Sequence, residues 1–226
     1  MKLRTALKLG RVSNLPTVWT NTLAGAVLAG AAGFGAEFAV MLLAFSLFYT
    51  GGMFLNDAFD AGIDARERPE RPIPSGEASR QEVSSWGIGM MAAGVALLAW
   101  VGLAMGPRTG IWPALGGLAL AASITFYNWK HKGNPLSPVV MGLCRVLVYV
   151  GAGLCYTTQP GDGLWIGAAL MLCYLIGLTY VAKQENLAEV RNLWPLLFLA
   201  APVLYGAAHI LHLPMIAPFW LLLCAW

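Results

Sequence analysis

The sequence predicts an all-α membrane protein that crosses the bilayer many times. Its 226 residues are 58% hydrophobic and only 11% charged, whereas a soluble domain carries roughly 25% charged residues. So few charges cannot cover a water-facing surface, while a lipid-facing surface requires none. Apolar runs long enough to cross about 30 Å of hydrocarbon also recur along the chain. The composition and the recurring runs exclude a soluble fold.

The apolar runs follow one another from the N-terminus onward and are separated by short polar or Gly- and Pro-rich segments. We expect about eight membrane spans. They lie near residues 13–33, 38–64, 83–105, 111–128, 136–155, 163–182 and 193–211, with a further span from 214. No stretch separates from the others, so residues 1–226 are interpreted as one membrane domain, a transmembrane helical bundle. The chain ends at Trp226 inside an apolar run, which predicts that the sequence is truncated at its C-terminus.

The basic residues lie almost entirely on one side of the expected bundle. With alternating spans, nearly all of the 14 Lys and Arg residues share that side; Arg108 lies in an opposite loop and Arg145 lies inside a span. An excess of positive charge marks the cytoplasmic side. We therefore expect an integral protein of a bacterial inner or plasma membrane, with its N-terminus and active site cytoplasmic. The basic segment 1–11 leads into a retained first span, because a cleavable signal peptide would have a shorter apolar core.

The four cysteines lie in apolar runs and lack the C-x-x-C spacing of a zinc or redox site. They are Cys144, Cys155, Cys173 and Cys224. We interpret them as small apolar packing residues.

Three aspartates fall on one face at the end of the second span. Asp57, Asp60 and Asp64 are spaced i, i+3 and i+7, with Asn56 at the border of the same face. Like charges at a helix C-terminus repel one another and the helix dipole. A bound divalent cation would compensate, and oxygen ligands without a nearby Cys or His favour Mg²⁺ over Zn²⁺. The alternative is a solvated helix end, although acids within a membrane helix are functional by default.

An Arg- and Pro-rich loop follows the acids. The run from Arg66 to Gly76 contains several prolines, which end the helix and keep the loop extended. Its arginines, among them Arg71, are suited to hold phosphate oxygens through paired hydrogen bonds. The alternative for Arg66 and Arg68 is that they only set the topology.

The run from Asn56 to Gly76 resembles the first signature of the UbiA superfamily of intramembrane prenyltransferases. It reads Asn56-Asp57-x-x-Asp60-x-x-x-Asp64, followed by Arg71-Pro72-Ile73-Pro74-Ser75-Gly76. Two further segments are similar to that family: Arg11-x-x-Asn14-x-Pro16 before a span with Asn21, and Tyr127-x-x-Lys130 followed by Asn134-Pro135-Leu136 and Gly142. Within the superfamily, the pattern is most similar to a branch found in bacterial biosynthetic clusters.

The resemblance implies Mg²⁺-dependent transfer of a prenyl group from an isoprenyl diphosphate donor to an aromatic or other small lipophilic acceptor in the lipid bilayer. No nucleic-acid partner is expected. The catalytic residues would be Asp57, Asp60 and Asp64, since the metal that they hold neutralises the leaving diphosphate. The expected metal ligands are Asn56, Asp57, Asp60, Asp64, Glu185 and Glu189. The expected diphosphate-binding residues are Arg71, Lys130, Lys183 and Arg145, and the expected acceptor-binding residues are Arg11, Asn14 and Asn21.

The second acidic motif departs from the family pattern. The family carries DxxxD at the end of its sixth helix, whereas this chain offers Glu185-x-x-x-Glu189, an i, i+4 pair on one helical face. Glutamate can also ligate Mg²⁺, so the pair predicts either a rearranged second metal site or a protein that binds only one metal well. The alternative is a solvated loop with a Glu–Arg pair.

Aromatic residues near the acids are candidates for stabilising an allylic carbocation through their electron-rich faces. They are Phe45, Phe48, Tyr49, Phe126, Tyr127 and Tyr149. Their alternative role is packing or an interfacial aromatic belt. Arg145 lies inside the fifth span, where a charge is costly unless a phosphate or a carboxylate compensates it.

Two other functions share some of these features. The CDP-alcohol phosphatidyltransferases also place aspartates and an arginine at a helix end, but the residues after Gly76 lack the further aspartates of their motif. A non-catalytic prenyl-lipid binding or transport protein on the same helices stays open, because the second acidic motif is altered. Binding of prenyl diphosphate without turnover would favour this alternative.

Overall fold

The computed structural model describes residues 1–184, 193–210 and 212–225. Its α-helices are α1 (Leu3–Gly10), α2 (Leu15–Leu28), α3 (Ala36–Glu67), α4 (Arg80–Ala104), α5 (Trp112–Lys130), α6 (Ser137–Leu154), α7 (Asp162–Gln184), α8 (Pro195–Ile210) and α9 (Ala217–Ala225). Two 3-10 turns, η1 (Val12–Asn14) and η2 (Pro214–Ile216), complete the regular structure. The described residues contain helices and turns but no strand, so the predicted all-α fold is confirmed.

Each expected span contains a helix, although the helices differ in length. Four of them, α3, α4, α6 and α7, are long and apolar enough to cross a membrane, and α8 is a shorter apolar helix. The first and last spans are shorter still, since α2 has 14 residues and α9 has 9. Together the apolar helices indicate an integral membrane protein.

Local sequence explains where several helices begin. Proline occupies one of the first two positions of α2, α5 and α6, where its missing N–H costs no helical hydrogen bond. The hydroxyl of Ser79 accepts a 3.1 Å hydrogen bond from the backbone N–H of Glu82 and thereby caps α4. This Ser-x-x-Glu pattern is a typical helix start.

The N-terminal segment forms a helix that the sequence analysis did not predict. Residues 1–11 do not lead directly into the first span, because α1 first packs Leu9 against Phe54 and Ala58 of α3. The opposite side of α1 leaves Leu3 and Leu7 exposed. An amphipathic helix of this length is too short to be found by a search for membrane spans.

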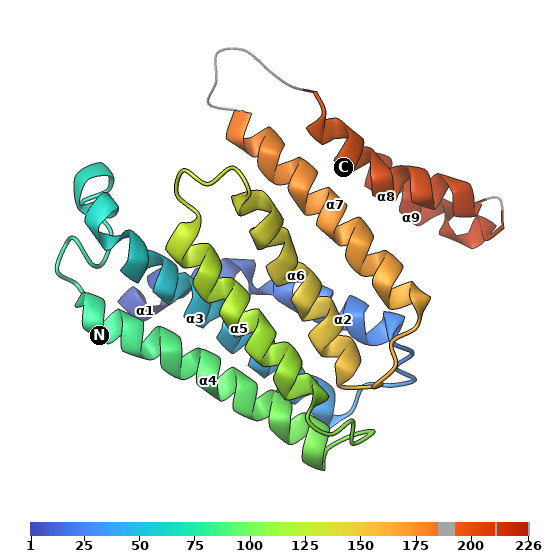
Figure 1. Cartoon of the computed structure of the whole chain (residues 1–226), viewed down its shortest axis with the longest axis horizontal. Helices are drawn as coiled ribbons and strands as arrows, with labels where there is room; N and C mark the ends of the chain where they lie inside the picture. The colour runs from blue at the N-terminus through green and yellow to red at the C-terminus, as the bar shows by residue number, and fades with distance from the viewer. Residues whose placement is uncertain (185–192, 211, 226) are drawn as a thin grey trace.

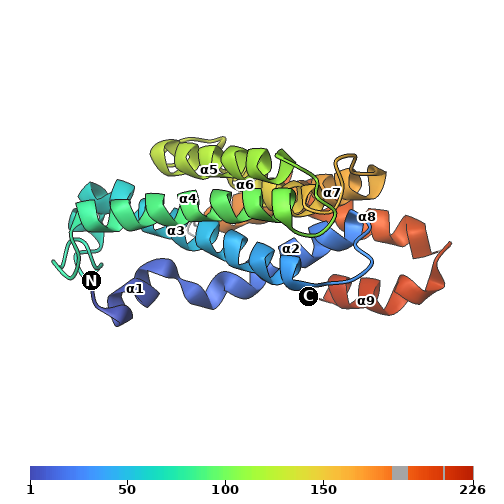
Figure 2. The same cartoon turned by 90° about the horizontal axis from the view of Figure 1, so that it is seen from below.

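The helices lie side by side in layers. Figure 1 shows α4, α5, α6 and α7 next to one another, with α8 and α9 beyond α7. Seen along the other axis, α3 lies beneath α4 and α5, and α1 and α2 follow one another along the lower face (Figure 2). Helix α3 therefore has neighbours on several sides, including α1, α2, α4 and α5.

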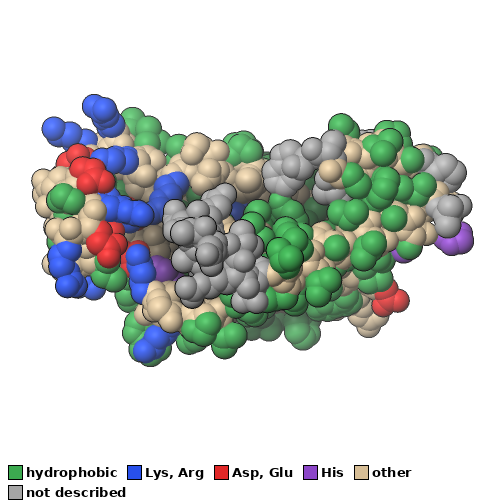
Figure 3. Space-filling model, turned by 90° about the horizontal axis from the view of Figure 1, so that it is seen from above, with side chains coloured by type: hydrophobic (Ala, Val, Ile, Leu, Met, Phe, Trp, Pro, Cys, Tyr) green, Lys and Arg blue, Asp and Glu red, His purple; other side chains and the backbone are tan. Residues whose placement is uncertain are grey.

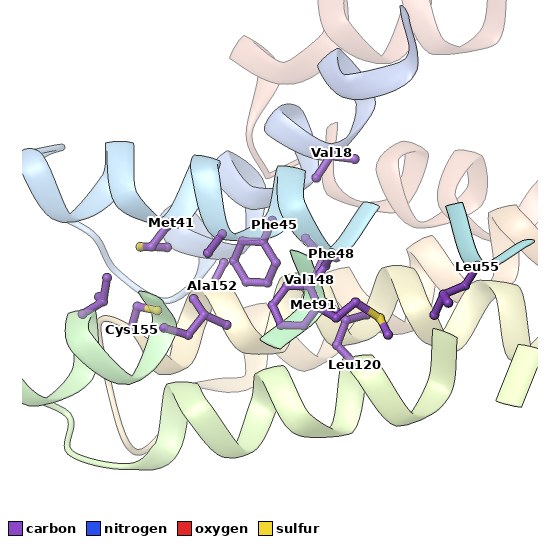
Figure 4. Packing of buried hydrophobic residues seen from close by; sticks show 13 residues of the cluster. Val18, Met41, Phe45, Phe48, Leu55, Met91, Leu120, Val148, Ala152 and Cys155 are labelled. Carbon is purple, nitrogen blue, oxygen red and sulfur yellow. The ribbon is translucent and has the colours of Figure 1, made fainter. Parts of the chain in front are cut away.

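Close packing fixes the middle of α3. The rings of Phe45 and Phe48 lie in the main core cluster, with Val148 and Leu120 nearby (Figure 4). One turn later α3 approaches α4 closely, because a Cβ added to Gly51 would lie 2.7 Å from the carbonyl oxygen of Gly87. Small residues of this kind allow membrane helices to approach backbone to backbone.

Helix α3 is longer than a bilayer crossing requires. Its 32 residues extend for about 48 Å at about 1.5 Å per residue, whereas the hydrocarbon core is about 30 Å thick. About one third of the helix therefore exceeds the length of an upright crossing, and Asp57, Asp60 and Asp64 belong to its C-terminal third. Lysine, arginine, aspartate and glutamate side chains gather at this end of the bundle (Figure 3), which we call the charged end.

Candidate functional site

The three aspartates of α3 are buried at the charged end. Asp57, Asp60 and Asp64 are 6%, 5% and 3% exposed, although their helix reaches beyond the apolar core. Buried carboxylates require partners. All three aspartates of the predicted common face are buried, and each has at least one cationic partner.

Two arginines from separate segments hold the first and last of these acids. Arg71 donates from Nη1 to Asp64 Oδ2 at 2.8 Å and lies 3.4 Å from Asp57 Oδ1. Arg11 donates from Nη2 to the same Asp57 oxygen at 3.0 Å. The backbone of Arg11 is left-handed, with φ 44°, a costly conformation for a residue with a side chain. This turn between α1 and η1 directs Arg11 towards the acid cluster.

Asp60 has a different set of partners. His131 Nε2 lies 3.5 Å from Asp60 Oδ2, and Lys132 Nζ lies 3.6 Å from the same oxygen. Both residues follow α5, and the His131 ring also stacks on Tyr127. The expectation that no histidine lies near the acids is wrong, because the fold brings His131 from a distant segment.

An amide chain fixes Asn56. Its Nδ2 donates to Asn128 Oδ1 at 3.2 Å, and Asn128 Nδ2 donates to the carbonyl oxygen of Gly52 at 3.0 Å. Because the amide nitrogen of Asn56 is used in this way, its oxygen faces the acid side, where Arg11 Nη2 lies 3.5 Å away. The sequence analysis missed Asn128; its only signal was a polar residue within an apolar span.

The donor set suits Mg²⁺ in its chemistry. Carboxylate oxygens of Asp57, Asp60 and Asp64, together with the amide oxygen of Asn56, are the ligands that this ion prefers. Within the described residues, however, no three acidic, histidine or cysteine side chains converge on one point; the carboxylates are instead paired with cations, and Asp57 and Asp64 share Arg71. Metal binding would therefore require these ion pairs to rearrange. Glu185 and Glu189 lie outside the described residues.

The expected phosphate-binding cations are in different environments. Arg71 lies in the acid cluster, whereas Lys130 is exposed and its Nζ lies 4.4 Å from the ring centroid of Trp129. Lys132, which the sequence analysis did not propose, is the lysine that reaches Asp60. Helix α7 extends through Lys183 to Gln184, but the side chain of Lys183 is not among those described.

A cavity of about 320 Å³ adjoins the acid cluster. Its walls come from α2, α3, α5, α6 and α7, and they are mostly apolar. Arg11, Asn56 and Asn128 line it on the side of the acids. Small-molecule sites typically combine apolar walls with a few polar groups in this way.

Four of the six aromatic residues proposed from the sequence line the cavity. They are Phe45, Phe48, Tyr49 and Tyr127. Phe126 instead is 47% exposed, and Tyr149 is buried but is not part of the cavity wall. The stabilisation of a carbocation by these rings stays a prediction.

The three residues expected at the acceptor are not together. Arg11 pairs with Asp57, Asn14 is exposed just before α2, and Asn21 is buried one turn before Gly25. A Cβ at Gly25 would lie 2.6 Å from the carbonyl oxygen of Tyr149, so this part of α2 packs on α6. Of the three side chains, the structure brings only Arg11 to the cavity wall.

Arg145 lines the same cavity from α6. Its Nη2 lies 3.3 Å from the hydroxyl oxygen of Thr17 on α2. None of the ion pairs found among the described residues includes Arg145. Thr17 had no role in the sequence analysis.

Comparison with known proteins agrees with this arrangement. Residues 18–226 match the UbiA prenyltransferase family. A digeranylgeranylglyceryl phosphate synthase of Methanopyrus kandleri is 29% identical over 213 residues, which are 90% of this chain and 70% of the relative. A protein of the same name from Ignicoccus hospitalis is 37% identical over 119 residues, 53% of this chain but only 37% of the relative. A third, from Sulfolobus acidocaldarius, is 32% identical over 196 residues, 85% and 67% of the two chains.

A solved structure from work on the biosynthesis of digeranylgeranylglyceryl phosphate synthase in membranes has a similar fold. It superposes with a TM-score of 0.68 and covers 99% of this chain and 94% of its own. Only 17% of the residues are identical, so the similarity concerns the fold alone.

Proposed function

Because the chain belongs to the UbiA prenyltransferase family, we propose that it transfers a prenyl group from an isoprenyl diphosphate to a lipophilic acceptor within the membrane. Family membership makes the protein a prenyltransferase. The observation that carries the finer proposal is the junction of the acid cluster with the cavity, since Arg11 and Asn56 belong to both. In this proposal residues 1–226 act as one membrane domain.

The diphosphate and the prenyl tail of the donor match the charged end and the apolar cavity, respectively. Its diphosphate would lie at the charged end, near Arg11, Arg71, His131 and Lys132, and its prenyl tail would lie in the apolar cavity. Guanidinium groups suit phosphate oxygens because they donate parallel hydrogen bonds. Lys183 and Lys130 stay predicted as further cations for the same group.

Mg²⁺ fits this proposal as the cofactor. Asp57, Asp60, Asp64 and Asn56 would hold it, with Glu185 and Glu189 as ligands from the second motif. When bound, the ion supplies a Lewis acid that neutralises the departing diphosphate. The arginines now paired with the acids would then be free to turn to the phosphate oxygens.

The transfer itself breaks the bond between the first prenyl carbon and the diphosphate oxygen, and the electron pair leaves with the diphosphate. The allylic cation is then captured by an oxygen or carbon of the acceptor, which loses a proton. Phe45, Phe48, Tyr49 and Tyr127 would face this cation from the cavity wall. The apolar walls would also exclude water, which would otherwise capture the cation.

The relatives' names suggest the chemical class of the acceptor. The relatives are named for a glyceryl phosphate product that carries two prenyl chains. We therefore propose that the acceptor is a glyceryl phosphate lipid that carries one prenyl chain, to which the second is added. An aromatic acceptor is the alternative class expected from the sequence. Either would present a nucleophile to the cavity.

The proposed orientation places the charged end in the cytoplasm. Positive residues from α1, the loop after α3 and the segment after α5 gather there (Figure 3), and excess positive charge marks the cytoplasmic side of membrane proteins. The N-terminus and the acid cluster would then both face a cytoplasmic supply of diphosphate donor and Mg²⁺.

The proposal predicts that Asp57→Asn abolishes Mg²⁺-dependent release of diphosphate. Purified protein would be supplied with geranyl, farnesyl or geranylgeranyl diphosphate, together with geranylgeranylglyceryl phosphate or para-hydroxybenzoate. We expect a loss of about 100-fold or more, because the charge that holds the leaving-group metal is removed.

Asp162→Asn provides the matched control for Asp57→Asn. It makes the same change in the first turn of α7, away from the acid cluster, and should alter the rate by less than about twofold. Full activity of folded Asp57→Asn would contradict the proposed metal site. Donor binding without turnover, whichever acceptor is supplied, would favour the non-catalytic binding or transport alternative.

A further inference from the structure

Arg145 is a charged side chain inside an apolar bundle. It lies eight residues after the first residue of α6, Ser137, a depth of about 12 Å at about 1.5 Å per residue. A guanidinium at such a position is costly unless it has a partner, and ionisable residues within membrane spans usually face a functional cavity. Arg145 does face one, since it forms part of the wall of the 320 Å³ cavity.

The only hydrogen bond that Arg145 makes within the described part of the chain goes to a neutral group. Its Nη2 donates to the hydroxyl oxygen of Thr17 at 3.3 Å. That hydroxyl uses its own proton elsewhere, because it donates to the carbonyl oxygen of Asn14 at 2.7 Å. Thr17 can therefore only accept from Arg145, which orients the guanidinium but provides no compensating charge, and none of the described residues forms an ion pair with it.

The acid cluster does not need this charge. Arg11 and Arg71 serve Asp57, Arg71 also serves Asp64, and His131 and Lys132 serve Asp60. The three carboxylates thus have cations without Arg145. An anionic partner for Arg145 is therefore to be sought in the cavity that it lines and not among these three acids.

We propose that Arg145, oriented by Thr17, binds an anionic group of the acceptor inside the cavity, at a site separate from that of the donor diphosphate. The group is an oxyanion, either a phosphate monoester or a carboxylate, since both offer two oxygens to a guanidinium fork. This inference rests on the proposed function, because it assumes that an acceptor enters the cavity. It assigns Arg145 to the acceptor, whereas the sequence analysis had assigned it to the diphosphate.

The site explains how two anionic substrates can be distinguished. The donor would be recognised by several cations and Mg²⁺ at the charged end, and the acceptor by one guanidinium among apolar walls. One guanidinium can bind a single phosphate or carboxylate group, whereas the larger diphosphate would meet several cations at the charged end. The acceptor would consequently be oriented with its nucleophile towards the junction at Asn56 and its anion towards α6.

The test compares binding of charged and neutral probe pairs to purified protein without donor. The first pair is geranylgeranylglyceryl phosphate and geranylgeranylglycerol; the second is para-hydroxybenzoate and its methyl ester. Wild-type protein should bind one anionic probe more tightly than its neutral partner. Arg145→Gln should lower that affinity by about 10- to 100-fold, as expected for a lost hydrogen bond to a charged group, and should leave the neutral probe unchanged.

Further variants keep the test decisive if Arg145→Gln fails to fold. Arg145→Lys should retain part of the preference for the anion because it keeps the charge, and Thr17→Val should weaken it by removing the orienting oxygen. Arg108→Gln, the same change in an exposed loop, should have no effect. The pair that responds identifies the anion as phosphate or carboxylate.

Two results would overturn the inference. The first is an equal loss of affinity for the charged and neutral probes in Arg145→Gln, and it counts together with a wild type that prefers neither anion, since both show that the anion is not recognised. The second is a raised KM for the prenyl diphosphate in Arg145→Gln with an unchanged KM for the acceptor. Both differ from failure of the proposed function, which would appear in the wild type as absence of Mg²⁺-dependent diphosphate release.

Discussion

The middle of α3 is buried by apolar packing, whereas its C-terminal end is buried by ion pairs. In the middle, Phe45 and Phe48 lie in the apolar core, and Gly51 lets the backbone of α4 approach. At the end, buried Asp57 and Asp64 are covered by charged partners that come from other segments. One helix thus combines a part held by shape with a part held by charge.

The difference has a consequence for the reaction. Apolar packing provides most of the cavity wall, and in the proposed reaction such a wall would keep water away from a reactive cation. Ion pairs provide charges that can exchange partners when a metal ion and a phosphate arrive. A site at the junction of the two parts has both properties within a few turns of one helix.

Arg71→Gln should have the largest effect, because it acts on the charged part. It leaves Asp57 without one partner and Asp64 without its 2.8 Å ion pair. Removing one member of a buried ion pair typically costs about 3–5 kcal/mol, and we expect the lower figure here since Asp57 keeps Arg11. Thermal or denaturant unfolding in detergent measures the loss. Addition of Mg²⁺ should recover part of the stability, and a variant as stable as the wild type without the ion would contradict the assignment.

Gly51→Ala should disturb the part held by shape. The added methyl group would lie 2.7 Å from the carbonyl oxygen of Gly87, so α3 and α4 must move apart, at a cost of about 1–3 kcal/mol. Gly62→Ala is the matched control in the same helix, because nothing lies within 4 Å of its added methyl group. It should stabilise the protein by about 0.5–1 kcal/mol through helix propensity. Similar unfolding midpoints for the two variants would show that the helices are not closely packed.

Replacing Lys130 or Lys132 by Gln should produce the smallest effect and shows which of these two lysines contributes to phosphate binding at the charged end. Lys132 lies near Asp60, whereas Lys130 lies over the ring of Trp129. Lys132→Gln should therefore raise the KM for a prenyl diphosphate by about 2- to 5-fold, as expected for an exposed ion pair. Lys130→Gln should raise it less. The opposite order would restore Lys130 as the phosphate ligand that the sequence suggested.

The positions of the helices could be predicted because apolar runs of sufficient length have few alternatives in a chain with so little charge. The common face of Asp57, Asp60 and Asp64 followed from helical spacing alone. The amphipathic α1 was missed because it is shorter than a span. The partners of the acids could not be predicted, since Asn128 lies 72 residues after Asn56 and contacts at such separations depend on how the helices pack.

The sequence by itself therefore determined the membrane class, the order of the helices and the common helical face of the three aspartates, because these depend on composition and on the period of one helix. Only the tertiary structure decided that His131 and Lys132 reach Asp60 and that Arg145 meets Thr17 across 128 residues. These contacts join different helices, and their geometry depends on close packing throughout the bundle. The same packing brings an apolar cavity next to a charged cluster, which no single segment of the chain contains.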